Sequence, residues 1–228
     1  MNMSYTNQLT KHIVEKIKSM DIDYTPSVII DAGSRDLDQS IEFAKAFPKA
    51  KIVAFEPNPS AYALCLEKAK NYQAITVFPY AISDINGEYD FHISPQDPGC
   101  SSLLEPDITL SRNPCGTSYN TIKVKTIRLD DFLREMNISK VDILWMDIQG
   151  GELLALKGLG TYINTIDFIE CEASQKGYYK NHPLLPELEK FFEEHGFDHK
   201  FYFPWEGPPH SFNEGELVCV NKKFLKIK

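Results

Sequence analysis

Hydrophobic and polar positions follow two alternating periods along this chain. Short apolar runs rich in β-branched residues predict strands at 28–30, 51–55, 75–79, 141–146 and 166–171. Apolar residues at helical spacing predict a helix after the first strand that Pro48 ends, and further helices at 60–69, 152–157 and 185–195. Strands that alternate with amphipathic helices are typical of right-handed β–α–β units in a mostly parallel sheet.

The two ends of the chain depart from this rhythm. Leu9, Ile13, Ile17 and Met20 recur at helical spacing and predict a helix within an N-terminal extension, 1–24. The runs 201–203 and 217–220 predict a terminal antiparallel strand pair. We therefore expect an α/β, doubly wound, Rossmann-like fold with a seven-stranded mixed sheet in one domain, 1–228.

One stretch in the middle follows neither period. Asn86-Gly87 is a turn signal, and the alternation of Tyr89, Phe91 and Ile93 after it predicts a hairpin. The segment 95–120 is rich in Pro, Ser, Gly and Asp and is too long for a plain connector. It is therefore either mobile or functional.

Charge and cysteine content limit the partners and the compartment. The net charge is -8 with a pI of about 5.3, which makes no electrostatic case for a nucleic acid or an anionic membrane. No continuous apolar stretch at the N-terminus indicates a signal peptide or a membrane span. Five cysteines without a Cys-x-x-Cys pair predict no disulfide framework, and Cys65, Cys171 and Cys219 fall in apolar runs. We expect a reducing, cytoplasmic location.

Acidic residues end several of the predicted strands. Asp31, Glu56, Asp147 and Glu172 stand at the carboxyl ends, where sheets of this kind bind their ligands. Gly33 follows Asp31 and permits close approach of a ligand to the backbone. An acid at the end of the second strand usually accepts hydrogen bonds from ribose hydroxyls, so the pattern predicts an adenosine-containing cofactor.

The first loop favours S-adenosylmethionine over a dinucleotide. It has the single glycine Gly33 and then Asp36 and Asp38, which would repel a pyrophosphate. Asp36 suits a helix N-cap, with Gln39 completing a capping box. S-adenosylmethionine has no phosphate and carries two positive groups, so it tolerates these acids.

Six motifs, in this order and at this spacing, resemble the FkbM-type methyltransferases. The resemblance extends from about Val28 to about Phe197. The motifs are Asp31-Ala32-Gly33, Ala54-Phe55-Glu56-Pro57-Asn58-Pro59, Ala81-Ile82-Ser83-Asp84, Gly99-Cys100-Ser101-Ser102-Leu103, Leu129-Asp130-Asp131-Phe132, and Leu144-Trp145-Met146-Asp147-Ile148-Gln149-Gly150-Gly151-Glu152-Leu153.

The resemblance implies a class I methyltransferase fold that binds S-adenosylmethionine, and it assigns roles to residues. Asp31, Gly33 and Ser34 would lie on the methionine side of the cofactor, and Glu56, Pro57 and Asn58 would lie at the ribose. The adenine would lie beside Ala81, Ile82, Ser83 and Asp84. Ser101 and Ser102 would lie over the cofactor from the irregular segment 95–120, and Asp147 would lie near the transferred methyl group. Two positions depart from the family: Leu37 replaces a usual second glycine, and Gln149 replaces a common glutamate.

Methyl transfer to oxygen needs an aligned acceptor and help in removing its proton. Alignment supplies much of the acceleration, and a base adds roughly 10²–10⁴-fold. We assign the catalytic base to Asp147 first and Glu172 second, with Glu170, His182 and His210 as weaker candidates. No histidine spacing typical of zinc is present, so no metal ligand is assigned; Mg²⁺ held by carboxylates remains an open alternative.

These observations predict an O-methyltransferase whose acceptor is a hydroxyl of a sugar, glycan or glycoside. The alternatives are a non-sugar natural product as acceptor, an NAD-binding oxidoreductase, and a catalytically dead cofactor-binding module. Leu37 and Gln149 support the last of these. The acceptor's identity and the oligomeric state do not follow from the sequence.

Overall fold

The computed structural model describes residues 9–20, 22–109, 116–197, 199–205 and 214–224. Within these ranges there are six α-helices: α1 (Leu9–Ser19), α2 (Asp38–Ala46), α3 (Pro59–Ala69), α4 (Leu129–Glu135), α5 (Glu152–Lys157) and α6 (Leu185–Glu194). The same ranges contain ten strands: β1 (Val28–Ala32), β2 (Lys51–Phe55), β3 (Ile75–Phe78), β4 (Ala81–Ile82), β5 (Gly87–Ile93), β6 (Asn120–Ile127), β7 (Ile143–Met146), β8 (Phe168–Ser174), β9 (His199–Pro204) and β10 (Glu214–Val220).

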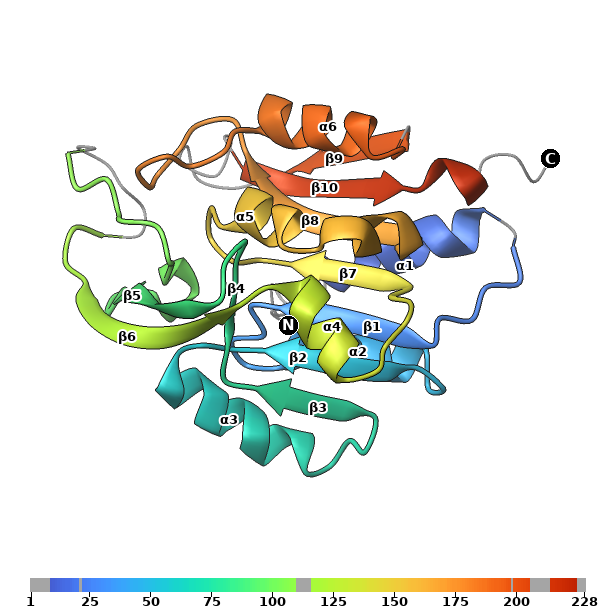
Figure 1. Ribbon diagram of the computed structural model, residues 1–228, viewed down its shortest axis with the longest axis horizontal. Coiled ribbons are helices and arrows are strands. Elements are labelled where there is room, and N and C mark those ends of the chain that lie inside the picture. The colour runs from blue at the N-terminus through green and yellow to red at the C-terminus, as the bar shows by residue number, and fades with distance from the viewer. Residues whose placement is uncertain (1–8, 21, 110–115, 198, 206–213, 225–228) are drawn as a thin grey trace, which may run out of the picture.

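Seven strands form the main sheet in the order β3-β2-β1-β7-β8-β10-β9. The first five pair in parallel, whereas β10 pairs antiparallel with both β8 and β9 (Figure 1). The mostly parallel sheet and the terminal antiparallel pair are thus confirmed. The strand order reverses direction at β1, beside β7, and this switch point is where doubly wound sheets form their ligand crevice.

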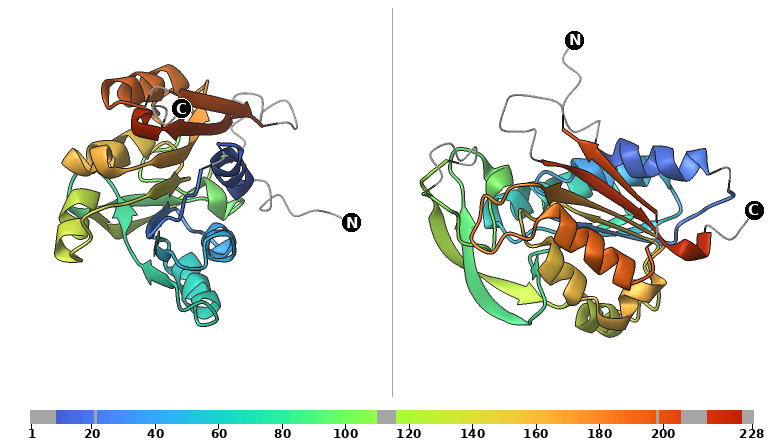
Figure 2. Two further views of the ribbon diagram at one scale, coloured as in Figure 1. Left: turned by 90° about the vertical axis from the view of Figure 1, so that its right-hand side faces the viewer. Right: turned by 90° about the horizontal axis from the view of Figure 1, so that it is seen from above.

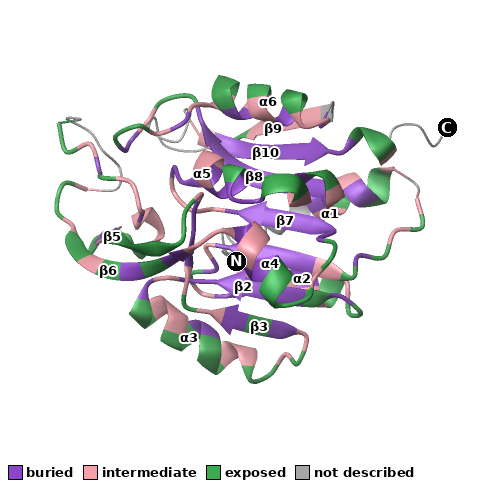
Figure 3. Cartoon of the chain, in the orientation of Figure 1, coloured by how far each residue is buried: buried purple, intermediate pink, exposed green. Residues whose placement is uncertain are grey.

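Helices cover both faces of this sheet (Figure 2). One face packs against apolar residues of α4, α5 and α6, and the other against those of α1, α2 and α3. With both faces covered, β1, β2 and β7 are buried almost throughout (Figure 3), as parallel strands require. This burial explains why these strands read as continuous apolar runs rather than as alternating ones.

The strand β8 is displaced from its predicted position. It runs to Ser174, so Glu172 lies inside the strand and not at its end as we expected. The extension has a clear cause: β10 pairs with β8 along its whole length, and Glu216 stands opposite Glu172. Pairing with β10 therefore extends β8 over polar residues that lie beyond the apolar run and that the run alone does not predict as strand.

A second sheet of three strands, in the order β4-β6-β5, lies beyond the carboxyl ends of the parallel strands (Figure 1). The predicted hairpin at Asn86-Gly87 is wrong, because β4 and β5 do not pair with each other. Both pair with β6, β4 in parallel and β5 antiparallel, so the true partner of β5 follows the irregular segment. The strands β4 and β6 and the helix α4 were not predicted as such.

The N-terminal helix α1 packs on the main sheet as its spacing predicts. Ile13 and Ile17 are buried against β8 and β10, and the Ile13 backbone N–H donates to the Glu170 carboxylate at 3.2 Å. The His12 ring stacks on Phe203 with 4.3 Å between ring centroids. None of the helices in the described ranges combines the length and apolar character needed to cross a membrane.

Candidate active site

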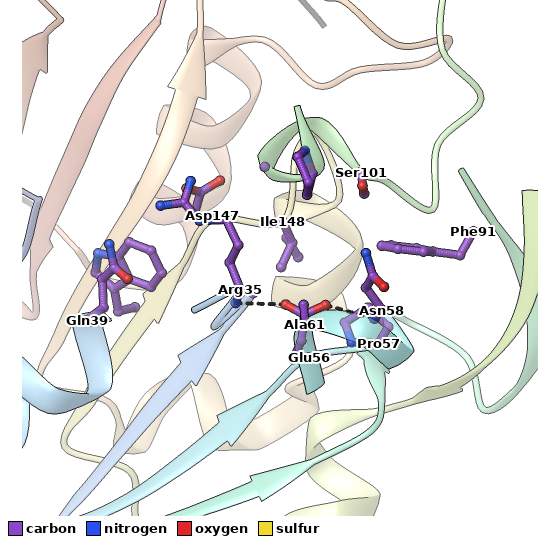
Figure 4. A pocket seen from close by; sticks show the side chains of 14 residues that line it. Arg35, Gln39, Glu56, Pro57, Asn58, Ala61, Phe91, Ser101, Asp147 and Ile148 are labelled. Atoms are coloured by element: carbon purple, nitrogen blue, oxygen red, sulfur yellow. Dashed lines mark hydrogen bonds between the residues drawn. The ribbon is translucent and has the colours of Figure 1, made fainter. Parts of the chain in front are cut away.

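A cleft opens at the switch point, between the carboxyl ends of β1, β2 and β7 and the irregular segment (Figure 4). It encloses about 580 Å³ of space, open solvent at its mouth included, which is a usual size for a small-molecule site. The residues that line it are Gly33, Arg35, Gln39, Glu56, Pro57, Asn58, Ala61, Phe91, Pro98, Gly99, Ser101, Trp145, Asp147 and Ile148.

Glu56 is fixed in the middle of the cleft by the backbone on both sides. Its two carboxylate oxygens accept hydrogen bonds from the Arg35 and Asn58 backbone N–H groups, each at 2.8 Å (Figure 4). Burial raises the pKa of Glu56 to about 7, and these two hydrogen bonds oppose the shift. Each oxygen keeps a second lone pair, so a fixed, bidentate acceptor faces the cleft.

The backbone of the first loop is shaped by Gly33. Its φ is +91°, and a side chain there would place a Cβ atom 1.9 Å from the Asp147 carbonyl oxygen. Two further residues, Arg35 and Leu37, adopt positive φ of 43° and 68° without being glycine. Leu37, where the resemblance to the family predicted glycine, thus takes a conformation that glycine adopts freely while its buried side chain fills the core.

Asp31 and Ser34 lie beneath the floor of the cleft and do not line it. Asp31 is fully buried and accepts a hydrogen bond from the Ser40 hydroxyl at 2.5 Å. Burial raises the pKa of Asp31 to about 6. The Ser34 hydroxyl donates to the Asp31 carbonyl oxygen at 3.2 Å, and its backbone N–H donates to Phe55. These two residues therefore support the loop that carries Gly33.

The helix α2 begins differently from our expectation. Its N-cap is Leu37 and not Asp36, and no side chain caps it. The Asp36 carboxylate accepts from the Asp38 backbone N–H at 3.3 Å instead. The predicted capping box is therefore wrong, and the side chain of Gln39 lines the cleft rather than closing the helix end. The left-handed conformation of Leu37 moves the cap by one residue.

An apolar slot adjoins the cleft and shares Gly33, Pro57 and Ile148 with it. Ala81 and Ile82 line this slot together with Phe55, Tyr80, Leu103 and Gly151. Ser83 and Asp84 do not line it: the Ser83 hydroxyl bonds to Asp84, whose carbonyl oxygen accepts from Arg128 at 2.6 Å. Of the four residues expected by the adenine, the structure thus brings two to the slot.

The part of the irregular segment around Pro98–Ser101 borders the cleft, and Ser102 ties it to the loop after β7. Ser101 lines the cleft, whereas the Ser102 hydroxyl is buried and donates to the Gln149 carbonyl oxygen at 2.7 Å. Cys100 is disulfide-bonded, which contradicts the expectation of no disulfide. Cys65, Cys171 and Cys219 are free and buried as predicted, and Cys115 lies outside the described residues.

Gln149 joins the two carboxylates that we selected as bases. Its side-chain amide donates to Asp147 Oδ1 at 2.8 Å and to Glu172 Oε2 at 2.6 Å, while its own Oε1 accepts from the Tyr179 hydroxyl at 3.0 Å. The residue has a φ of +54°, a conformation that costs energy outside glycine and is often found at functional sites. Asp147 lines the cleft; Glu172 lies behind it and reaches it through Gln149.

Further buried acids continue from this pair across β8 and β10. Burial and then Asp147 raise the pKa of Glu172, and burial and Asp147 raise that of Glu214 to about 7. Burial followed by Glu170 raises the pKa of Glu216, whose Oε1 accepts from the Trp205 indole at 3.2 Å. Across the described ranges, no Lys or Arg side chain pairs with these acids or with Asp147.

Of the two histidines considered as bases, the structure describes His182, which does not line the cleft. His182 is half-buried, and its Nδ1 accepts from the Tyr178 backbone N–H at 3.2 Å. Burial lowers the pKa of His182 to about 4, which keeps the ring neutral. His210 lies outside the described residues. Among the side chains that the structure describes, no group of three or more His, Cys, Asp or Glu residues is arranged to hold a metal ion.

Sequence reasoning missed several residues that line the cleft. Trp145 reads as core because it stands in a buried strand, and Gln39 reads as a helix cap. Phe91 comes from the small sheet, whose pairing was not predicted, and its approach to β2 carries no local signal. For Trp145 a signal existed: inside an otherwise aliphatic strand it brings a polar N–H that needs a partner.

Two solved structures of methyltransferases share this arrangement. The chain matches the METTL16 MTase domain with a TM-score of 0.56 at 9% identity, covering 96% of this chain and 69% of that one. It matches a putative caffeoyl-CoA O-methyltransferase from Staphylococcus aureus with a TM-score of 0.53 at 8% identity, covering 93% and 82%. The fold is the Rossmann-like class I methyltransferase fold.

Sequence comparison defines the family within this class. Residues 31–198 match the methyltransferase FkbM domain, and the chain belongs to the FkbM family of S-adenosylmethionine-dependent methyltransferases. It is 33% identical over 175 residues to the 2-O-methyltransferase NoeI of Sinorhizobium fredii, covering 71% of this chain and 72% of that one. It is 26% identical over 126 residues to the hexuronic acid methyltransferase AglP of Haloferax volcanii, covering 54% and 47%.

Proposed function

We propose that this protein transfers a methyl group from S-adenosylmethionine to a hydroxyl of a sugar, glycan or glycoside. One observation carries the proposal: a bidentate buried carboxylate, Glu56, faces the same cleft at the switch point of the sheet as Asp147, an acid that pairs with no cation among the described residues. NoeI and AglP, which are similar to this chain, are named as a 2-O-methyltransferase and a hexuronic acid methyltransferase, and these names favour a sugar hydroxyl as acceptor.

The cleft fits the cofactor in shape and in chemistry. The apolar slot at Ala81 and Ile82 suits the adenine ring, and Glu56 beside it can accept hydrogen bonds from both ribose hydroxyls. Gly33 has no side chain, so a ligand can approach the backbone closely between the apolar slot and Glu56. Pro57 and Asn58 hold the turn after β2, because the Asn58 side chain caps α3 by accepting from the Ser60 N–H at 3.1 Å.

The residues beyond Gly33 supply the chemistry at the acceptor. Bound S-adenosylmethionine provides an electrophilic methyl group. Asp147 Oδ1 is engaged by Gln149, so Oδ2 is available to accept the proton of an acceptor hydroxyl in the cleft. Glu172 is held on the same amide behind the cleft wall, and it is the second candidate for the base.

Calorimetric titration with S-adenosylhomocysteine tests the cofactor site. We expect saturable binding, weakened about 10- to 100-fold in Glu56→Gln, because this change replaces charge-assisted hydrogen bonds to the ribose by neutral ones. The matched control is Glu88→Gln, an exposed acid on β5, which leaves the affinity unchanged. A folded protein that binds no S-adenosylhomocysteine contradicts the proposal.

An acceptor screen with the cofactor-competent protein then tests the substrate class. Matched neutral, amino and uronic acid forms of one hexose separate sugars by charge, and a set of phenolic and aliphatic alcohols represents non-sugar natural products. Transfer to alcohols and not to any sugar contradicts the sugar assignment and leaves O-methyl transfer intact. Each assay is run with EDTA and with added Mg²⁺, so that a metal requirement shows directly.

A further inference from the structure

The indole N–H of Trp145 is a buried donor without a partner. Trp145 is 1% exposed, and its Nε1 forms no hydrogen bond with any described group. Buried indole N–H groups nearly always find an acceptor, because leaving one unpaired costs about 1–3 kcal/mol. The residue lines the cleft beside Asp147, so an acceptor for this donor can come from a molecule bound there.

Two acids stand next to Trp145 in the sheet, yet neither accepts its N–H. In the strand register Trp145 lies opposite Asp31 on β1 and opposite Glu170 on β8. Asp31 is engaged by the Ser40 hydroxyl through one oxygen, and Glu170 by the α1 backbone, and each keeps one oxygen without a hydrogen bond. The Glu170 oxygen lies 3.5 Å from His12 Nδ1. Neither oxygen accepts the Trp145 N–H, so a molecule in the cleft that Trp145 lines can supply the acceptor.

Gln39 brings a second unused amide to the same end of the cleft. Its side chain lines the cleft from the first turn of α2 and takes part in none of the hydrogen bonds of the described residues. Because Leu37 is the N-cap of α2, the Gln39 amide does not form a capping box. Trp145 and Gln39 therefore present N–H donors together, close to the N-terminus of a helix, an arrangement that suits a carboxylate.

The position of these donors matches one end of the cofactor. In Figure 4, Gln39 and Asp147 lie to one side of Glu56, and Phe91 lies to the other. The apolar slot at Ala81 and Ile82 and the ribose acceptor Glu56 define the nucleoside half of the cleft. The amino-acid half then falls toward Trp145 and Gln39, at the end of the cleft that Asp147 also lines.

We propose that Trp145 is a cofactor-positioning residue whose indole N–H donates a hydrogen bond to the carboxylate of the amino-acid end of S-adenosylmethionine. The Gln39 amide is the second donor to that carboxylate. By holding this end, the pair sets the depth at which the methyl group lies relative to Asp147. This inference rests on the proposed function, and its test is designed so that the two can fail separately.

The test compares two ligands that differ only at the amino-acid end. S-adenosylhomocysteine carries the ammonium and the carboxylate, and 5′-methylthioadenosine has the same nucleoside thioether without them. We expect Trp145→Phe to weaken S-adenosylhomocysteine about 10-fold, the usual loss for one hydrogen bond to a charged group, and to leave 5′-methylthioadenosine within twofold. Trp205→Phe, which removes the other tryptophan of the chain, leaves both affinities unchanged.

A second measurement does not depend on the stability of the variant. The chain has two tryptophans, so the ¹⁵N–¹H spectrum of the wild-type protein contains two indole signals, and Trp205→Phe assigns them. We expect S-adenosylhomocysteine to move the Trp145 signal downfield, as hydrogen bonding to a carboxylate does. We expect 5′-methylthioadenosine to leave that signal close to its position in the free protein.

The outcomes separate the two proposals. If the wild-type protein binds both ligands, and Trp145→Phe weakens both equally or neither, the positioning role is overturned while the cofactor site stands. An indole signal that responds equally to both ligands overturns it as well. If the folded wild-type protein binds neither ligand, the proposed function itself fails, and the inference falls with it.

Discussion

Buried acids at the two ends of the parallel strands have different partners. We call the side of the sheet where these strands begin the amino edge, and the side where they end the carboxyl edge. At the amino edge, Asp142 and Asp167 immediately precede β7 and β8; at the carboxyl edge, Asp147 follows β7 and Glu172 lies near the end of β8. The same two strands thus carry an acid at each end. The partners of these acids differ, and that difference separates structure from chemistry.

At the amino edge every acid has a cation or a backbone donor. Lys140 pairs with both aspartates, Lys223 pairs with Asp167, and the Tyr24 hydroxyl donates to Asp167 at 3.0 Å. Asp142 also accepts from the backbone N–H groups of Ser27 and Val28 at 2.8 and 2.9 Å. Burial opposes it, but Lys140 and these N–H groups hold the pKa of Asp142 below its usual value.

At the carboxyl edge the acids face one another with a single amide between them. Gln149 serves Asp147 and Glu172, and Glu214 and Glu216 adjoin them without a lysine or arginine partner among the described residues. Uncompensated buried acids destabilise the fold and are retained where chemistry needs them. We infer that the acids at the amino ends of β7 and β8 stabilise the sheet and that those at the carboxyl ends belong to the candidate site.

The largest effect is expected for Asp147→Asn. Methyl transfer falls at least about 100-fold, because the group that accepts the hydroxyl proton is lost, while the melting temperature stays the same or rises. Initial rates of S-adenosylhomocysteine formation on the acceptor from the screen, together with a thermal melt, measure both. A near wild-type rate would show that Asp147 is not the base and would move the assignment to Glu172.

Asp167→Asn sharpens the comparison from the other edge. We expect the free energy of unfolding to fall by about 2 kcal/mol, because Lys140 and Lys223 lose the carboxylate they share. The affinity for S-adenosylhomocysteine should not change. Urea denaturation and calorimetry measure the two quantities, with Asp90→Asn, from an exposed pair with Lys123, as the control expected within about 0.5 kcal/mol. A loss of affinity without a loss of stability would contradict this division.

The pH dependence of stability distinguishes the edges without mutation. Burial raises the pKa of Asp31 to about 6, of Glu56 to about 7 and of Glu152 to about 8, above the unfolded values near 4. Between the unfolded and folded pKa values, the folded state binds more protons than the unfolded state. The stability that these groups contribute is therefore fully present below pH 4 to 5 and is lost as the pH rises through 6 to 8.

We therefore expect the free energy of unfolding to fall by at least about 1.4 kcal/mol, the equivalent of one pKa unit, between pH 5 and pH 8. The lowered pKa of Asp142 acts in the opposite sense, and its contribution disappears only in more acidic solution, below its ordinary range. Urea denaturation in a series of buffers gives the profile. Stability that rises from pH 5 to pH 8 would rule out this account of the carboxyl edge.

The smallest effect is expected for Glu214→Gln. Removing one of several mutually repelling acids should stabilise the fold by about 0.5 kcal/mol at pH 8, and the gain should vanish near pH 5, where the wild-type side chain is protonated. Glu88→Gln on the exposed strand β5 provides the pH-matched control. A destabilisation at pH 8 would indicate that Glu214 makes a favourable contact in the folded state.

Local pattern predicted the elements whose burial is set by neighbours in sequence. The strand 51–55 and the helix 152–157 have the predicted bounds, because apolar runs and helical spacing report directly which side chains face the core. Errors arose where a distant segment intervened. β10 extends β8 past its apolar run, β6 replaces the predicted hairpin partner of β5, and Leu37 moves the start of α2.

For the site, ordered acids at strand ends and the family motifs predicted which segments meet at the cleft. They could not distinguish the side chains that line it from those that support it, because strand ends and loop residues point either way. Glu56, Ser101 and Asp147 face the cleft, whereas Asp31 and Ser102 are buried and do not line it. Trp145 illustrates the same limit: its apolar ring predicts core, and only its place on the cleft wall shows a free N–H.

Periodicity, strand-end acids and short motifs were enough to establish a doubly wound methyltransferase fold, since each depends on residues close together in the chain. The pairing of acids with cations was not accessible in this way. Lys140 and Lys223 reach Asp167 from separate segments, and Glu172, Glu214 and Glu216 meet only because β10 returns beside β8. Whether a buried acid has a cationic partner depends on distances in space, which the fold determines. The acids at the two ends of these strands therefore look alike in the sequence and differ in the folded protein.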